Sequence, residues 1–163
     1  MKKDRVEERR HLWARSLEPI IKGGILQVTR PQPYTGYFIR EITPSSTTDP
    51  ERGFHLRDKQ YYLLIKEAWL RYEDDDDYIL VKWKYQFSKP DGGCYSGKFE
   101  WVFRYDFNAL ATEASPVARQ PHLNVHHPRP IEDHIHYPVG PDPWAPSEFV
   151  DFLVYHFPSL RDD

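Results

Sequence analysis

The sequence predicts an α+β fold, an antiparallel β-sheet meander packed by N- and C-terminal helices. Three observations lead to this prediction: a charged segment with helical spacing near the N-terminus, three long alternating segments joined by turn sequences, and a second helical segment near the C-terminus. Aromatic residues make up 15% of the chain, which fits strands with aromatic faces. The length of 163 residues is typical of one domain, so residues 1–163 are expected to share one core.

The first helix is expected over residues 4–18. Apolar residues recur in and just after this segment at close to helical spacing, at Val6, Trp13, Leu17 and Ile20. Pro19 marks the end of the helix, because proline breaks the backbone hydrogen bonding of a helix interior. Segments 25–28 and 34–42 follow as two strands, separated by the Pro-Gln-Pro sequence at 31–33.

The centre of the sheet is expected to contain three long antiparallel strands, at residues 60–72, 78–88 and 95–106. The acidic run 74–77 joins the first pair, and the Pro-Asp-Gly-Gly turn at 90–93 joins the second. Alternation gives the middle strand an apolar side with Ile79, Val81, Trp83, Tyr85 and Phe87. The opposite side carries charge on both later strands, at Lys82, Lys84, Lys98, Glu100, Arg104 and Asp106. With a short candidate strand at 133–137, the sheet is expected to have about four to six strands.

Residues 108–143 are predicted to form a histidine-rich loop, because prolines are frequent and regular periodicity is mostly lost. Five of the eight histidines fall there: His122, His126, His127, His134 and His136. A C-terminal helix is expected over residues 147–157, with helical spacing at Phe149, Phe152, Leu153 and His156. That helix can cover the apolar face of the sheet.

Charge and composition narrow the classes of function. The formal charge of −3 argues against nonspecific coating of nucleic acid, although a local basic patch can still bind a short RNA. The single cysteine, Cys94, cannot form an internal disulfide, and the charged start does not resemble a signal peptide. No apolar run approaches the roughly 20 residues of a membrane-spanning helix. We therefore expect a cytoplasmic protein without a membrane partner.

The histidine cluster and the charged sheet face together suit metal-free cleavage of RNA. That reaction needs a base near the 2′-hydroxyl, an acid near the leaving oxygen and a cation for the phosphate charge. His134 and His136 fall on one side of a strand and are expected to supply the acid and base. Arg104 is expected to hold phosphate, and Asp106 to orient a histidine or the arginine. Residues expected to contact the RNA are Lys82, Lys84, Lys98, His126, His127 and Tyr137.

Other interpretations of the same residues stay open. His126, His134 and His136 are an alternative ligand set for a divalent metal, as in a metal-dependent hydrolase, although no H-E-x-x-H or cysteine-based zinc motif is present. Histidines in a proline-rich loop can also be simple solvated residues. A non-catalytic module that binds protein or nucleic acid through an aromatic and charged surface is the remaining class.

The order of motifs resembles the TumE-type toxin components of bacterial toxin-antitoxin pairs over roughly residues 60 to 157. The matching pieces are Val102-Phe103-Arg104-Tyr105-Asp106, then Pro121-His122 or His126-His127-Pro128, then His134-Ile135-His136. The interval between Asp106 and His122 is longer than in that family. The resemblance implies a growth-inhibiting, RNA-cleaving toxin that is masked by an antitoxin protein. It assigns the site to Arg104, Asp106, His122, His134 and His136.

Overall fold

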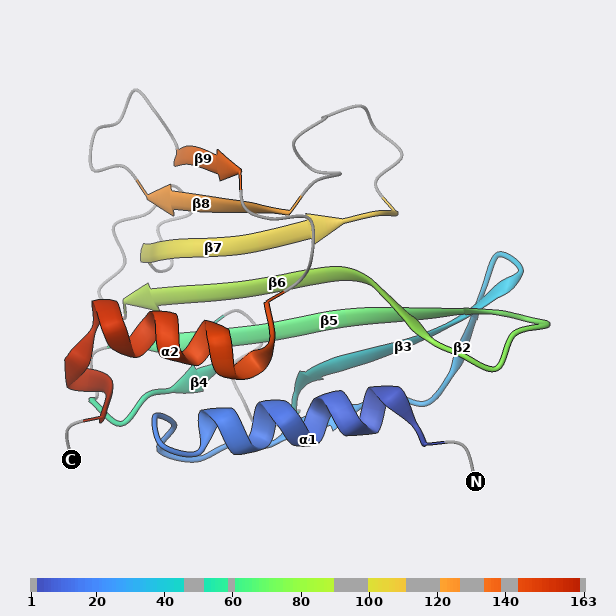
Figure 1. Ribbon diagram of the computed structural model, residues 1–163, viewed down its shortest axis with the longest axis horizontal. Coiled ribbons are helices and arrows are strands. Elements are labelled where there is room, and N and C mark those ends of the chain that lie inside the picture. Colours follow the sequence, from blue (N-terminus) through green and yellow to red (C-terminus); the bar gives the residue numbers. More distant parts are fainter. Residues whose placement is uncertain are drawn as a thin grey trace.

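The computed structural model describes residues 3–45, 52–58, 61–89, 100–110, 121–126, 134–138 and 144–161. Within these ranges the protein has one antiparallel sheet with both long helices on the same face (Figure 1), which confirms the predicted α+β class. In this part of the chain, no helix combines the length and the apolar character needed to cross a membrane.

The helices are α1 (Arg5–Leu17), α2 (Pro146–His156) and the short 3-10 helix η1 (Pro158–Arg161). The strands are β1 (Leu26–Val28), β2 (Gln32–Tyr34), β3 (Tyr37–Pro44), β4 (Phe54–His55), β5 (Tyr62–Tyr72), β6 (Ile79–Lys89), β7 (Glu100–Asn108), β8 (His122–His126) and β9 (His134–Pro138). The sheet order is β1-β3-β5-β6-β7-β8-β9, with β2 paired to β3 and β4 paired to β5. The sheet is therefore larger than the four to six strands expected from the sequence.

The N-terminal helix α1 begins at Arg5, directly after its capping residue Asp4. The Asp4 carboxylate accepts hydrogen bonds from the backbone N–H groups of Val6 and Glu7, at 3.0 and 3.3 Å, and so satisfies two donors that lack helical partners. Val6, Trp13 and Leu17 form the buried stripe of the helix. Both its position and the face it buries confirm the prediction.

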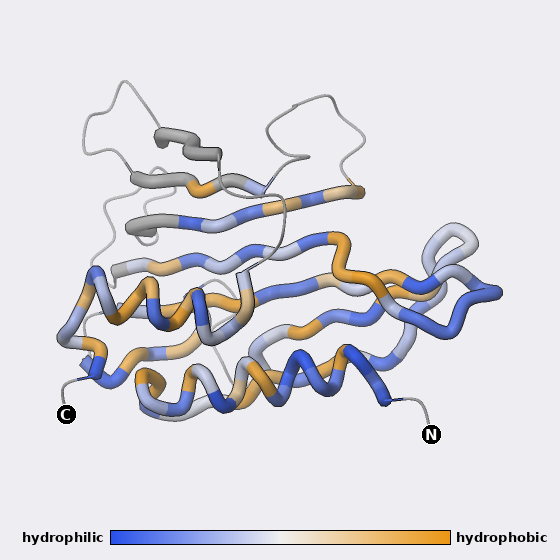
Figure 2. Tube along the Cα trace, in the orientation of Figure 1, coloured by the Kyte–Doolittle hydropathy of each residue, from blue (hydrophilic) through white to orange (hydrophobic). Residues whose placement is uncertain are grey.

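The main core lies between the two helices and the sheet. Its largest fully buried side chains include Trp13 of α1, Phe149 of α2, and Tyr85, Phe87 and Tyr105 of the central strands. The Trp13 and Tyr85 rings meet edge to face with centroids 4.9 Å apart, a geometry that aromatic pairs prefer. Hydrophobic and hydrophilic residues alternate along parts of the central strands (Figure 2). Because Tyr85, Phe87 and Tyr105 pack in the main core, the polar residues between them belong to the face away from the helices.

A β-bulge between β5 and β6 changes the predicted faces at one end of β6. The pairing shifts register between Ala68 and Trp69, because the bulge leaves Val81 without a paired residue on β5. Val81 consequently packs with Ala68 and Leu70 in a second, smaller cluster, away from the main core. The prediction that Ile79 and Val81 share a face with Trp83 is therefore wrong; Trp83 packs in the main core as expected.

Strand β8 lies inside the segment predicted to be an irregular loop. Leu123 and Val125 alternate with His122, Asn124 and His126, which is the two-residue period of a strand. Prolines at both ends of this segment and its short length hid the pattern in the sequence. Strand β9, by contrast, falls where the short candidate strand was expected. The turn at 90–93 and residues 95–99 lie outside the described ranges.

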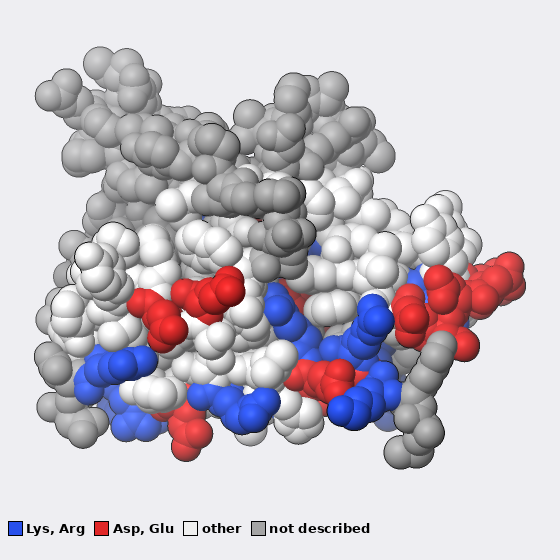
Figure 3. Space-filling model, viewed as in Figure 1, with Lys and Arg blue, Asp and Glu red and all other residues white. Residues whose placement is uncertain are grey.

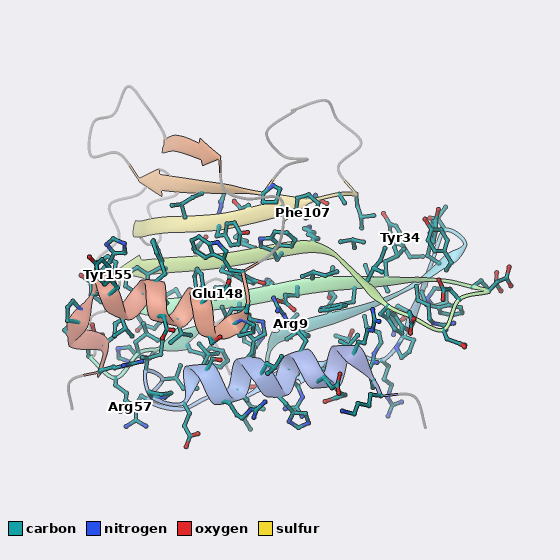
Figure 4. All side chains as sticks on the ribbon, in the orientation of Figure 1. Arg9, Tyr34, Arg57, Phe107, Glu148 and Tyr155 are labelled. Carbon is teal, nitrogen blue, oxygen red and sulfur yellow. The ribbon has the colours of Figure 1, made fainter. Side chains whose placement is uncertain are left out.

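A buried carboxylate, Glu67, joins α1 to the sheet on the helix-covered face. Its side chain is 0% exposed, and its oxygens accept hydrogen bonds from Trp13 at 2.8 Å, from Trp69 at 3.1 Å and from the Tyr85 hydroxyl. Arg9 reaches from α1 toward the sheet (Figure 4) and forms an ion pair of 3.0 Å with the same carboxylate. Because the charge is paired and hydrogen-bonded, its burial is tolerated.

Candidate functional site

The candidate site lies on the sheet face away from the helices, over β6 and β7. Lys82 and Lys84 of β6 and Arg104, Asp106 and Asn108 of β7 line a shallow hollow of about 300 Å³ there. Alternation along two neighbouring strands brings these five side chains together, because every second residue of a strand faces the same side. The structure thus gathers four of the polar residues that the sequence indicated, and it adds Asn108.

Arg104 and Asp106 form an ion pair along one strand. Arg104 Nε donates a short hydrogen bond to Asp106 Oδ2, and the two side chains are 29% and 17% exposed. The residues are two positions apart on β7, so both project from the same face. The carboxylate therefore restricts the orientation of the guanidinium by accepting a hydrogen bond from its Nε.

Positive charge is concentrated around Lys84. Burial, and then the neighbouring Arg104 guanidinium, lower the pKa of Lys84 below its usual value, and Lys66 and Lys82 act in the same direction. The Asp106 carboxylate offsets this effect in part. Arg104, Lys66 and Lys82 each disfavour the charged form of Lys84, so positive charge accumulates at this part of the sheet face.

Backbone pairing sets the position of the histidines relative to this hollow. Asp106 is paired with His122 on β8, and Arg104 is paired with Asn124. On the next strand, Asn124 is paired with His136. Two rows of residues therefore cross the strands: Lys66, Lys84, Asp106 and His122 form the first, and Gln86, Arg104, Asn124 and His136 form the second.

The strand register shows which of the expected catalytic histidines lies nearest the Arg104–Asp106 ion pair. His122 is the direct cross-strand neighbour of Asp106, so their Cα atoms lie about 5 Å apart. His136 shares the row of Arg104 but lies two strands away, at roughly 10 Å. His134 is paired with His126, one row further along. The pair expected to act together, His134 and His136, therefore lies further from Asp106 than His122 does.

The alternative metal ligands also occupy neighbouring register positions. His126 and His134 are directly paired, and His136 follows His134 by two residues on the same strand. Among the side chains that the structure describes, no three His, Cys, Asp or Glu residues form a group that could hold a metal ion. The divalent-metal interpretation therefore depends on the register of β8 and β9.

The structure does not place the other three expected contact residues at this hollow. Tyr137 is paired with Leu123, which packs against the main core, so its register position belongs to the helix-covered face and not to the face of Arg104. Lys98 and His127 lie outside the described residues.

Sequence reasoning missed two polar residues of β5, Lys66 and Glu67. Lys66 is paired with Lys84 and lies on the face of the candidate site, whereas Glu67 belongs to the buried network of the core. The available signal was their position within an otherwise apolar strand, since charged residues in a central strand call for a partner. Comparison of the chain with family models, with curated proteins and with solved structures finds no match.

Proposed function

We propose that the protein is a cytoplasmic RNA-cleaving toxin component, similar to the TumE-type toxins, whose growth-inhibiting activity is masked by an antitoxin protein. The observation that carries this proposal is the row Lys84, Asp106 and His122 beside the Arg104 ion pair. It combines a cation cluster, a carboxylate and a histidine position on one face, the groups that acid-base cleavage of a phosphodiester requires.

The proposed reaction uses the 2′-hydroxyl of the RNA as the nucleophile. A histidine takes the hydroxyl proton, and the 2′-oxygen attacks the adjacent phosphorus. The bond from phosphorus to the 5′-oxygen breaks, and a second histidine donates a proton to that oxygen, leaving a cyclic phosphate and a free 5′-hydroxyl. His122 is the candidate base because Asp106 is its cross-strand neighbour, and His136 is the candidate acid.

Arg104 and Lys84 have an electrostatic role in this scheme. The phosphorane gains negative charge as the 2′-oxygen attacks, and fixed cations stabilise that charge more than they stabilise the ground state. Both cations are partly shielded from water, since Lys84 is partly buried and the Arg104 side chain is 29% exposed. Charges interact more strongly where less water surrounds them.

The test is cleavage of a labelled RNA by purified protein, with and without a chelator. His122→Ala and the double variant His134→Ala/His136→Ala are each expected to lose at least about 100-fold in rate, the usual contribution of a general acid or base. His11→Ala is the matched control, because His11 is exposed on α1 and lies on the helix side. Full cleavage activity in both histidine variants would contradict the assignment of these histidines as acid and base.

A metal-dependent hydrolase is the second candidate, and the paired positions of His126 and His134 favour it. In that case a chelator abolishes cleavage and a divalent cation restores it, whereas the acid-base scheme is insensitive to chelation. A metal-dependent enzyme for a small phosphorylated or cyclic substrate would bind metal without acting on RNA. Binding of RNA without any cleavage would instead identify a non-catalytic module.

Toxicity and masking are tested in a bacterial host. Induced expression of the wild-type chain is expected to stop growth, and the His122→Ala chain is expected not to. Co-expression of the protein encoded by the neighbouring reading frame should restore growth and yield a complex on purification. Normal growth during wild-type expression, at a level that matches the variant, would contradict the toxin assignment.

A further inference from the structure

A second hollow lies next to the candidate site on the same face of the sheet. It has a volume of about 310 Å³ and is lined by residues of β3, β5 and β6: Glu41, Thr43, Lys66, Glu67, Ala68, Lys82 and Lys84. Lys82 and Lys84 line both hollows, so the two adjoin each other at β6. The second hollow extends the site away from the histidines.

Three lysines in this hollow repel one another. Lys66 and Lys84 are direct cross-strand partners, and Lys82 is paired with Ala68 in the adjacent row. Like charges placed opposite each other destabilise a strand pair. Among the described residues, no hydrogen bond or ion pair neutralises any of the three ammonium groups. Such a group of cations is stabilised when an anion binds between them.

The acidic residues around the hollow balance these charges only in part. The Asp106 carboxylate offsets some of the positive charge at Lys84. The Glu67 carboxylate is held by Arg9, Trp13, Trp69 and Tyr85 on the helix-covered face. Glu41 is exposed at the edge of the hollow, on β3. The local excess of positive charge contrasts with the net charge of −3 of the whole chain. It also contrasts with the helix side, where cations and anions are interspersed and the β5–β6 turn is acidic (Figure 3).

We propose that the hollow formed by Lys66, Lys82 and Lys84 is a second phosphate subsite, which binds the backbone of a single-stranded RNA flanking the cleaved linkage. This inference rests on the proposed function, because it assigns the RNA to the same face. The RNA would cross the strands along the row that leads from His122 through Asp106 and Lys84 to Lys66.

The spacing along this row suits more than one phosphate. Lys66 and His122 are three strands apart, which corresponds to roughly 14 Å. Even in a stacked helical strand, one phosphate occurs for about every 3.4 Å of axis, so the row spans several backbone charges. The scissile phosphate would lie by Arg104, and a neighbouring phosphate would lie between the lysines.

The electrostatics of Lys84 agree with a bound anion. Burial is the largest cause of its lowered pKa, and repulsion from Arg104, Lys66 and Lys82 adds to it. A phosphate between these cations would offset that repulsion. The small apolar cluster of Ala68, Leu70 and Val81 adjoins the hollow. Such a surface supports the aliphatic stems of lysines while their ammonium groups reach the ligand.

The test measures binding of a 2′-O-methyl oligonucleotide, which keeps the phosphates but lacks the hydroxyl nucleophile and therefore stays intact. Fluorescence anisotropy at several salt concentrations compares wild type with Lys66→Gln, and with Lys22→Gln as the matched control on the helix side. Lys66→Gln is expected to raise Kd several-fold and to lower the slope of log Kd against log salt by about 0.7, the value for one lost contact to a single strand. Lys22→Gln should change neither quantity.

An unchanged slope and Kd in folded Lys66→Gln would overturn the subsite. Thermal unfolding verifies folding, and no loss of stability is expected, because the substitution removes a like-charge contact. Binding of inorganic tripolyphosphate that depends on Lys66, without binding of the oligonucleotide, would assign the hollow to a small phosphate ligand and overturn the RNA assignment. Cleavage of RNA is measured separately. If wild type cleaves RNA but Lys66→Gln leaves the slope of log Kd against log salt unchanged, the proposed function stands and the subsite does not. If binding of the oligonucleotide depends on Lys66 but no RNA is cleaved, the subsite stands and the proposed function does not.

Discussion

The two faces of the sheet each carry a carboxylate, and the two carboxylates differ in burial and in the number of groups that bind them. On the helix-covered face, Glu67 is fully buried and is held by donors from four side chains. On the other face, Asp106 is 17% exposed, is paired with Arg104 and lines a hollow that contains two lysines. One carboxylate completes the core, whereas the other is accessible to a ligand. Burial and donor number therefore distinguish a structural charge from a candidate functional charge.

Substitution of Glu67 is expected to have the largest effect on stability of the variants that test this difference. Glu67→Ala leaves the Arg9 cation without its partner in the interior, so we expect a loss of about 3–5 kcal/mol in the free energy of unfolding. Urea denaturation measures this change. The exposed Glu18 supplies the control, since Glu18→Gln should stay within about 0.5 kcal/mol of wild type. An equally small effect at Glu67 would show that the network does not stabilise the fold.

Substitution of Asp106 should give the opposite pattern. Asp106→Asn is expected to lower the rate of RNA cleavage about 100-fold, equivalent to about 2.7 kcal/mol of activation free energy, since it no longer orients Arg104 and the His122 position. The free energy of unfolding should change by no more than about 1 kcal/mol, because the ion pair is partly exposed. A variant that loses stability but keeps its cleavage rate would reverse the roles of the two carboxylates.

Removing one hydrogen-bond donor to Glu67 should destabilise the fold less than removing the carboxylate itself. Tyr85→Phe deletes a buried hydroxyl that donates to the carboxylate, and we expect a loss of about 1.5 kcal/mol in the free energy of unfolding. Burial, and then the Glu67 carboxylate, raise the pKa of Tyr85, so its hydroxyl stays protonated as a donor at neutral pH. A matched Tyr155→Phe variant, altered at an exposed tyrosine of α2, should leave the urea midpoint unchanged.

Lys84 should show the smallest effect, with stability and binding changing in opposite directions. Its folded-state pKa is lowered by burial and by Arg104, Lys66 and Lys82, so protonation favours the unfolded state. Lys84→Gln is therefore expected to raise the free energy of unfolding at neutral pH by less than about 1 kcal/mol while weakening RNA binding.

The pH dependence provides a second measurement on Lys84. Between its lowered folded-state pKa and the usual lysine pKa, Lys84 binds more protons in the unfolded chain than in the folded protein. The free energy of unfolding of wild type should therefore rise relative to that of Lys84→Gln as pH approaches about 10. Urea denaturation of both proteins across this interval gives the difference. A constant difference would mean that the lysine charge does not oppose folding.

Much of the fold could be predicted from local patterns. The apolar stripe of α1, the alternation of β6 and β7 and the acidic turn between β5 and β6 are all encoded within short segments. The bulge at Ala68 and Trp69 could not be predicted, because it depends on how two strands pair. Strand β8 was missed because it is formed by pairing with β7 and β9, which no local pattern in this proline-rich segment determines.

The candidate site was predictable in its residue types but not in its arrangement. Arg104 and Asp106 share a face by alternation alone, which the sequence shows. The pairing of Asp106 with His122 depends on the register of β7 and β8, which no local pattern determines. The same holds for Lys66, whose partner Lys84 is 18 positions later in the chain. It also holds for Glu67, three of whose donors come from two other elements, α1 and β6.

The order of strands has a consequence for how the molecule loses its function. From β5 to β9 the strands follow one another in space as they do in sequence, and β9 is paired with β8 alone among the described strands. Such a sheet can open from its edge by sub-global unfolding while the helices and central strands stay folded. Backbone amides of β9 should then exchange with solvent before those of β5, and heat should abolish cleavage below the temperature at which the core melts.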